Sequence, residues 1–305
     1  MLSAITTLLI IAPITLHQLF DRAVSSRAEL TSFELDFTCT QNLNQQSNDN
    51  VYEISSEVNT VGSVRFDHLS GVVLVRQKDE LIKLDGKPQS FIDEYRADFN
   101  SGNKVRYITE TEEYIWEPNS QTMVRKPRDA PPSYLELPFY LHAYGLGCLH
   151  DIRSLSPLEQ ILHDLKQVHP DVELKVDSEG IAHFDTNLSH FAFATKQGYW
   201  PIRQTQWKLV SSDPLKYEVW EGCEMQLVDV DKCWVPSKVK LTNGKSVTRF
   251  DFEWISVNKT VDPETIDVRA IESELRVEIA KEVEEKARES ERNLRRENKT
   301  PRSNK

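Results

Sequence analysis

The chain has 305 residues, of which 39% are hydrophobic and 28% charged, which is enough apolar material for a folded core. Its net charge of −11 argues against a protein that holds nucleic acid by neutralising phosphates. Lysine and arginine are scattered outside the C-terminal tail, so no basic groove is indicated. We therefore expect a folded protein without a nucleic-acid partner.

The chain begins with an apolar run. Residues 2–16 have the length of a signal peptide and are short for a membrane span. The first basic residue is Arg22, and the best small-residue cleavage motif is Ala23-Val24-Ser25. We interpret residues 1–15 as a signal peptide, with a buried or membrane-surface helix as the alternative. The mature protein is then expected to lack a stable membrane span and to be periplasmic or otherwise extracytoplasmic.

A helix and a strand are predicted next. Apolar residues at helical spacing predict an amphipathic helix ending near Thr31, although Arg27 interrupts its stripe. The residues of the stripe are Leu16, Leu19, Phe20, Ala23 and Leu30. Residues 33–39 then alternate between apolar and polar, which is the period of a half-buried strand.

Two β-rich blocks follow, at residues 52–125 and 172–257. The first contains short strand patterns separated by turn-forming groups, and the second alternates aromatic with polar residues. Asn243-Gly244 in the second block is a strong hairpin signal. This spacing favours an antiparallel meander over parallel β-α-β units. We expect the two blocks to form one curved, open antiparallel sheet, a mainly β fold.

The middle of the chain differs from both blocks. Residues 135–149 are rich in apolar and aromatic side chains, and Ser156-Pro157-Leu158-Glu159 is a capping box with proline at the first helical position. A helical stripe continues from there to Val168. We expect residues 131–168 to form a helical lid over the sheet.

Cysteine spacing gives no metal signature. None of the four cysteines lies in a C-x-x-C pair, and no histidine lies close to Cys223 or Cys233. We therefore expect no metal site and no cofactor. Cys223 and Cys233 flank a predicted hairpin, so their disulfide is the best single pairing. Four unpaired, mostly buried thiols (Cys39, Cys148, Cys223 and Cys233) are the alternative.

The C-terminal segment, residues 268–305, is charged. Residues 268–297 favour helix, with only a thin apolar stripe at Ile271, Leu275, Ile279, Val283 and Ala287. The pattern predicts a solvated helix with opposite charges four residues apart, followed by a disordered tail. A helix that binds a protein partner, or a short coiled coil, is the alternative. Removal of residues 267–305 is expected to leave the sheet domain folded.

Catalytic motifs are missing from the sequence. It contains no nucleophile elbow, phosphate loop, dinucleotide glycine motif or H-E-x-x-H helix. Glu112 and Glu113 are adjacent on a strand and would point to opposite faces, which does not suit a glycosidase pair. Asp36 is expected to face solvent, and the histidines, His163 among them, are spread along the chain. We therefore expect a protein that is not an enzyme.

Aromatic residues give the positive indication of function. Trp200, Trp207, Trp220, Trp234 and Trp254 all fall in the second β block. In a closed sandwich they would be core residues. In a curved single-layer sheet they would leave an apolar face, which needs a ligand or a lid because large apolar patches are rarely left bare.

The order of helix, strands, proline-led helical insertion and strands resembles the bacterial outer-membrane lipoprotein carrier family, the LolA- and LolB-like proteins. The resemblance covers about residues 16–268 and rests on the order of several short motifs. These are Thr31-Ser32-Phe33-Glu34-Leu35-Asp36-Phe37 with Gln41, Gly62-Ser63-Val64-Arg65-Phe66, Tyr114-Ile115-Trp116-Glu117-Pro118 through Met123-Val124, and Trp254 to Val257 with Asn258 and Thr260. The chain departs from the family in its weak export signal, its four cysteines and its long charged tail.

The resemblance implies an unclosed β-barrel with a helical lid and a hydrophobic cavity for acyl chains. Residues 16–267 are then one domain that binds lipid or a lipidated protein. Leu137, Phe139, Tyr140 and Tyr144 of the lid are the candidate ligand-binding residues, unless they are core residues. An interaction or sensory module on the same fold, with residues 268–297 as its partner site, is the alternative function.

Overall fold

The computed structural model describes most of the chain outside the middle segment. The described residues are 14–46, 53–68, 71–86, 89–90, 92–93, 96, 103–117, 120–129, 137–139, 174–186, 188–212, 214–259 and 267–297. The predicted capping-box helix, Tyr140, Tyr144, Cys148 and His163 lie outside the described residues.

The described elements are mostly strands. In chain order they are α1 (Leu16–Ala28), β1 (Ser32–Gln46), β2 (Glu53–Asp67), β3 (Val72–Asp85), β4 (Lys104–Ile108), β5 (Glu112–Glu117), β6 (Thr122–Pro127), β7 (Lys175–Val176), β8 (Ile181–Asp185), β9 (Ser189–Ala194), β10 (Trp200–Ser212), β11 (Leu215–Val230), β12 (Cys233–Asn243), β13 (Ser246–Val257) and α4 (Val268–Glu297). Within the described residues, no helix is both long and apolar enough to cross a membrane.

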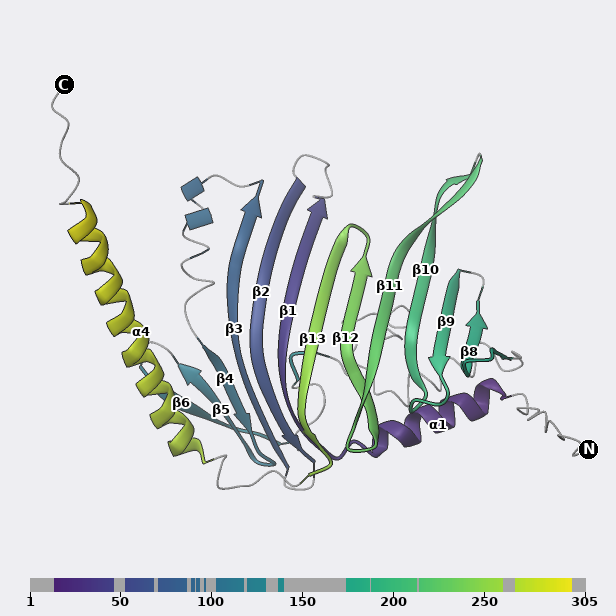
Figure 1. Cartoon of the computed structure of the whole chain (residues 1–305), viewed down its shortest axis with the longest axis horizontal. Coiled ribbons are helices and arrows are strands. Elements are labelled where there is room, and N and C mark those ends of the chain that lie inside the picture. Colours follow the sequence, from purple (N-terminus) through teal and green to yellow (C-terminus); the bar gives the residue numbers. More distant parts are fainter. Residues whose placement is uncertain are drawn as a thin grey trace, which may run out of the picture.

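The strands form one 13-stranded antiparallel sheet in the order β6-β5-β4-β3-β2-β1-β13-β12-β11-β10-β9-β8-β7. Two meanders, β1 to β6 and β7 to β13, are joined where β1 pairs with β13 at the centre. The predicted single, open antiparallel sheet is confirmed. Figure 1 shows it as a curved layer with α4 beside the β4–β6 end and α1 below the opposite end.

This strand order determines where the middle segment begins and ends. β6 and β7 follow one another along the chain but occupy the two opposite edges of the sheet. The connection between them, residues 128–174, therefore begins at one edge of the sheet and ends at the other. We call it the crossing segment.

The sheet has one apolar face, here called the core face. Register places Phe37 of β1 opposite Phe252 of β13 and opposite Gly62 of β2, so these residues share a face. A Cβ added to Gly62 would lie 2.5 Å from the carbonyl oxygen of Arg76 and 2.7 Å from the Phe37 ring. Glycine is therefore required at this position because the ring of its neighbour lies directly over it. Alternate residues form the opposite, polar face; Asp36 is exposed there, as predicted.

Helix α1 covers one end of the core face. Thr15 caps the helix: its Oγ1 accepts from the backbone N–H of Gln18 at 3.2 Å, and the Gln18 side chain accepts from the backbone N–H of Thr15 at 3.2 Å. The apolar stripe of the helix packs on strands β8 and β9. The buried residues of this contact include Leu16, Leu19, Phe20 and Ala23 of α1 with Ala182, Phe184, Phe191 and Phe193 of the sheet. The cluster also includes Ile14, so the folded part extends at least to that residue.

Helix α4 packs on the polar face. Ile271 and Leu275 are each 1% exposed and contact a cluster on β3, β4 and β5 that includes Leu74 and Trp116. The expectation of a solvated helix is therefore wrong for the first turns of α4. Further along, Val283 is 62% exposed, as a solvated helix predicts. The docked turns argue against the expectation that residues 267–305 are dispensable for folding.

The proposed disulfide between Cys223 and Cys233 is wrong. Cys223 of β11 lies opposite Leu241 of β12, whereas Cys233 lies opposite Val230. At the usual rise along a strand, the eight residues from Cys233 to Leu241 span roughly 26 Å. A disulfide requires Cα atoms within about 7 Å, so the register excludes this bond.

Strands β10 and β11 extend beyond their neighbours. β9 stops pairing with β10 at Gln206, and β12 stops pairing with β11 at Glu221. The strands pair only with each other over residues 208–219, here called the 208–219 ribbon, which projects from the sheet in Figure 1. Its exposed apolar residues are Leu209, Val210, Leu215, Tyr217 and Val219.

Candidate functional site

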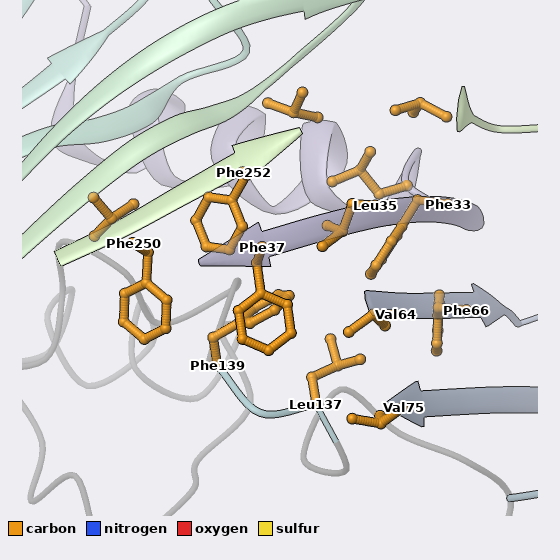
Figure 2. Close-up of a cluster of buried hydrophobic side chains, with 14 of the residues drawn as sticks. Phe33, Leu35, Phe37, Val64, Phe66, Val75, Leu137, Phe139, Phe250 and Phe252 are labelled. Carbon is orange, nitrogen blue, oxygen red and sulfur yellow. The ribbon is translucent and has the colours of Figure 1, made fainter. Parts of the chain in front are cut away.

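The crossing segment places two of the four predicted ligand-binding residues on the core face. Leu137 is 4% exposed and Phe139 is 2% exposed. Figure 2 shows both side chains lying against the apolar residues of the central strands. The other two predicted residues, Tyr140 and Tyr144, lie outside the described residues.

Phe139 occupies an aromatic cluster at the middle of the sheet. Its ring centroid lies 4.9 Å from that of Phe252, 5.4 Å from that of Phe37 and 6.2 Å from that of Phe250. All three contacts are edge-to-face, the arrangement that aromatic quadrupoles favour. The three partner rings come from β1 and β13, the strands that join the two meanders. The crossing segment therefore contacts the sheet midway between its edges.

The predicted tryptophans separate into two groups. Trp200, Trp234 and Trp254 belong to the core-face cluster or pack against it. The indole N–H of Trp200 donates to the Trp234 carbonyl at 2.7 Å, and that of Trp254 donates to the Pro236 carbonyl at 2.5 Å. These bonds fix both rings while their apolar surfaces line the core face. Trp207 and Trp220, by contrast, lie at the base of the 208–219 ribbon, and Trp220 is 41% exposed.

A small polar group interrupts the core face near Cys39. Register aligns Cys39 of β1, Thr60 of β2 and Asp79 of β3 in one row. The Asp79 carboxylate accepts from the Thr60 hydroxyl at 2.7 Å and from Lys104 Nζ at 2.6 Å. Burial, with a smaller contribution from the negative charge of Asp79, raises the pKa of the Cys39 thiol to about 12. Cys39 is therefore a protonated apolar residue and not a nucleophile.

The polar face holds a trough made of three connected depressions. Their volumes are about 590, 420 and 310 Å³, the first two sharing Asp251 and the last two sharing Asp36. Charged side chains along it pair with each other: Lys238 Nζ lies 2.6 Å from Asp251, and Lys240 Nζ lies 3.3 Å from Glu224. Because these charges compensate one another, the trough has no defined preference for a charged ligand.

The adjacent carboxylates Glu112 and Glu113 are engaged in ion pairs. Glu113 lies 2.7 Å from Arg106 Nη2, and Glu112 contacts Arg125 and the hydroxyl of Tyr114. Among the described residues, no group of three His, Cys, Asp or Glu side chains could hold a metal ion. Among the described residues, the apolar core face is therefore the best candidate for a binding site.

Sequence analysis missed one residue beside this face. Arg27 looked like a break in the apolar stripe of α1, yet its side chain is 3% exposed. Its Nη1 donates to the Gly198 carbonyl at 2.9 Å, and its Cζ lies 3.2 Å from the centre of the Trp200 ring. No local pattern marks Arg27 as buried, because its partners come from the turn between β9 and β10.

Together these features define a protein whose open apolar sheet face is contacted at its centre by Leu137 and Phe139 of its own β6–β7 connection. No family model and no curated protein matches the chain. Similar solved structures include a DUF1329 family protein from Desulfovibrio piger, with 11% identity and a TM-score of 0.35. The alignment covers 84% of this chain and 98% of that protein. LprF from Mycobacterium bovis has 9% identity and a TM-score of 0.27, with 82% and 96% covered. These scores support no functional argument, so the resemblance to lipoprotein carriers stays a prediction.

Proposed function

We propose that the chain is a non-enzymatic, extracytoplasmic binding protein whose core face takes up the acyl chain of a lipid or a lipidated protein. In the ligand-free protein the crossing segment occupies part of that face through Leu137 and Phe139. An acyl chain displaces these side chains and lies on the phenylalanines of β1 and β13.

The observation that carries this proposal is the position of Phe139. Its ring lies among Phe37, Phe250 and Phe252 at the centre of the sheet. It is held there by a connection between opposite edges of the sheet. An open sheet has a single layer, so whatever covers its apolar face must be a helix, this segment or a ligand. Exchange of one apolar group for another on the same surface needs no change in the strands.

The energetics of exchange favour an apolar ligand. Burying a phenylalanine side chain contributes about 1.5–3 kcal/mol, and each buried methylene contributes about 0.8 kcal/mol. A chain of several methylenes can therefore outweigh the contact that it replaces. A polar ligand would leave the rings without a compensating apolar partner and would not displace Phe139.

The direct test is native mass spectrometry of gently purified protein, followed by lipid extraction. We expect a bound mass that disappears on delipidation and is restored by adding dodecanol. A Leu215→Ser variant should keep this binding, because Leu215 is exposed on the 208–219 ribbon, away from the core face. Failure of both the purified and the delipidated protein to bind an acyl chain would refute the proposal. Fractionation of cells that express the full chain tests the extracytoplasmic location.

A second candidate function rests on α4. Its first turns dock on β3 to β5, but Val283 and Ala287, further along the same apolar stripe, are exposed. Such a stripe on an extended helix suits pairing with another helix. Analytical ultracentrifugation of the full chain and of a chain ending after Ala280 tests this function. A dimer that dissociates on truncation favours the second candidate, and two monomers exclude self-pairing.

A further inference from the structure

Arg27 is a buried cation with an unused hydrogen-bond donor. It lies in the last turn of α1, and its side chain is 3% exposed. Nη1 donates to the Gly198 carbonyl at 2.9 Å, while Nη2 is buried and has no hydrogen-bond partner among the described residues. Burial lowers the pKa of the guanidinium well below its ordinary value. Desolvation therefore acts on this cation without a compensating carboxylate.

A buried charge without a counter-charge among the described residues is unfavourable for the ligand-free protein. Arginine stays charged in proteins and offers a planar fork of donors that fits carboxylate and phosphate oxygens. Stacking on Trp200, with Cζ 3.2 Å from the ring centre, holds the guanidinium plane in place. The group is thus oriented before any anion arrives, and an anion would satisfy Nη2 and offset the lost hydration.

The surroundings of Arg27 are apolar and continuous with the proposed acyl site. Trp200 belongs to the cluster that contains Phe139 and Phe252, and Ala23, one helical turn before Arg27, belongs to the cluster of α1 with β8 and β9. Three strand spacings separate β13 from β10, which is about 14 Å at the usual distance between strands. An apolar chain that displaces side chains from the central rings would therefore have to span about this distance to reach Arg27.

We propose that Arg27 binds the anionic head of an amphiphile whose acyl chain lies on the core face. This inference rests on the proposed function and names its ligand class: an acyl chain that carries a carboxylate or a phosphate. Nη2 donates to an oxygen of the head group while Nη1 keeps its bond to Gly198.

Affinity for a matched ligand series tests the assignment. Delipidated full-length protein is titrated at neutral pH with dodecanoate, dodecyl phosphate and dodecanol in a calorimeter. We expect at least one of the two anions to bind about tenfold or more tightly than dodecanol, the gain of one charge-assisted hydrogen bond. The dodecanoate and dodecyl phosphate titrations distinguish a fatty acid from a phosphate-headed lipid.

Two variants on the same helix separate binding from folding. Arg27→Met keeps the stem and removes the charge, so we expect it to lose the preference for anions and retain the affinity for dodecanol. Arg22→Met is the control, because Arg22 is exposed and donates to the Tyr199 hydroxyl at 2.6 Å in the same turn. We expect this variant to keep the preference. We also expect Arg27→Met to be no less stable than wild type without ligand, since an unpaired buried charge is removed.

Three outcomes would decide against the inference, and a further measurement decides if the variant does not fold. Equal affinity of wild type for all three ligands, or an anion preference that survives Arg27→Met, overturns the anion site but leaves the proposed function standing. No binding of any ligand overturns both. If Arg27→Met fails to fold, the pKa of the dodecanoate carboxyl group is measured by NMR of its ¹³C-labelled carboxyl carbon while the ligand is bound to wild type. A carboxylate that pairs with Arg27 has a pKa below its value in water, and a carboxyl group that is buried without a cation has a pKa above that value.

Discussion

Phe139→Ala tests whether the crossing segment and an acyl ligand compete for one surface. The ring is 2% exposed, and its centroid lies 4.9 Å from that of Phe252. In a core that cannot open, truncating a phenylalanine to alanine costs about 3–5 kcal/mol of stability. In a segment that detaches from the sheet, the loss is limited to the free energy with which that segment docks.

The same substitution predicts a gain in affinity. A buried phenylalanine side chain contributes about 1.5–3 kcal/mol to the docked state that a ligand has to displace. Removing that contribution raises the affinity for dodecanol by a factor on the order of ten to a hundred. If the Phe139 side chain instead contacted the ligand as part of a cover over it, the same truncation would weaken binding.

Calorimetric titration with dodecanol and thermal unfolding are measured on the same samples. Phe252→Ala is the matched control: its ring belongs to the sheet itself, so we expect it to weaken binding and to lower stability. If Phe139→Ala lowers the stability by the full amount expected for a core truncation and does not bind dodecanol more tightly, the competition is refuted. Phe139 would then be an ordinary core residue.

Five further substitutions test other parts of the structure. Cys39→Ala changes how the free energy of unfolding depends on pH. The pKa of the Cys39 thiol is raised to about 12 in the folded protein, so its contribution to that free energy is intact below the pKa of the unfolded state and is lost progressively as the pH rises above it. That loss is about 1.4 kcal/mol per pH unit above about pH 9, so urea unfolding of the variant between about pH 8 and 10.5 should show a shallower decline. Gly62→Ala forces a contact with backbone and should cost about 1–3 kcal/mol in denaturant unfolding. Leu275→Ala should cost about 2–5 kcal/mol, whereas Val283→Ala should stay within about 0.5 kcal/mol of wild type; equal effects would contradict the docking of α4. Leu215→Ser should leave the melting temperature unchanged and reduce light scattering at high concentration, because it removes an exposed apolar group from the 208–219 ribbon.

The sheet could be predicted because its signals are local. Residues 33–39 alternate strictly, and the structure has Phe33, Leu35 and Phe37 buried in β1. Asn243-Gly244 marks the turn between β12 and β13, where Gly244 has φ 55°. Leu137 and Phe139 could also be placed in a covering segment from their composition. Their partners on the sheet could not, since the pairing of β1 with β13 is a long-range event.

The errors share a cause, which is that burial depends on a distant surface. The stripe of α4 is too narrow to predict docking, and only the apolar patch around Leu74 and Trp116 explains why Leu275 is buried. Arg27 interrupts the apolar stripe of α1 in the sequence, but in the structure the turn that contains Gly198 covers the Arg27 side chain. The proposed bond between Cys223 and Cys233 required a register that the length of the hairpin excludes.

The pairing of β1 with β13 has a consequence for how the molecule forms during synthesis. Phe37 and Phe252 are neighbours in space but more than two hundred residues apart along the chain. The N-terminal meander therefore leaves the ribosome with the hydrogen-bonding edge of β1 unsatisfied, and its partner β13 emerges only after β7 to β12 have been made. Such distant pairings close slowly because the loop entropy is lost before the contact is gained. Until then, an exposed apolar edge invites pairing with other chains, so we expect a holding chaperone to raise the yield of folded protein.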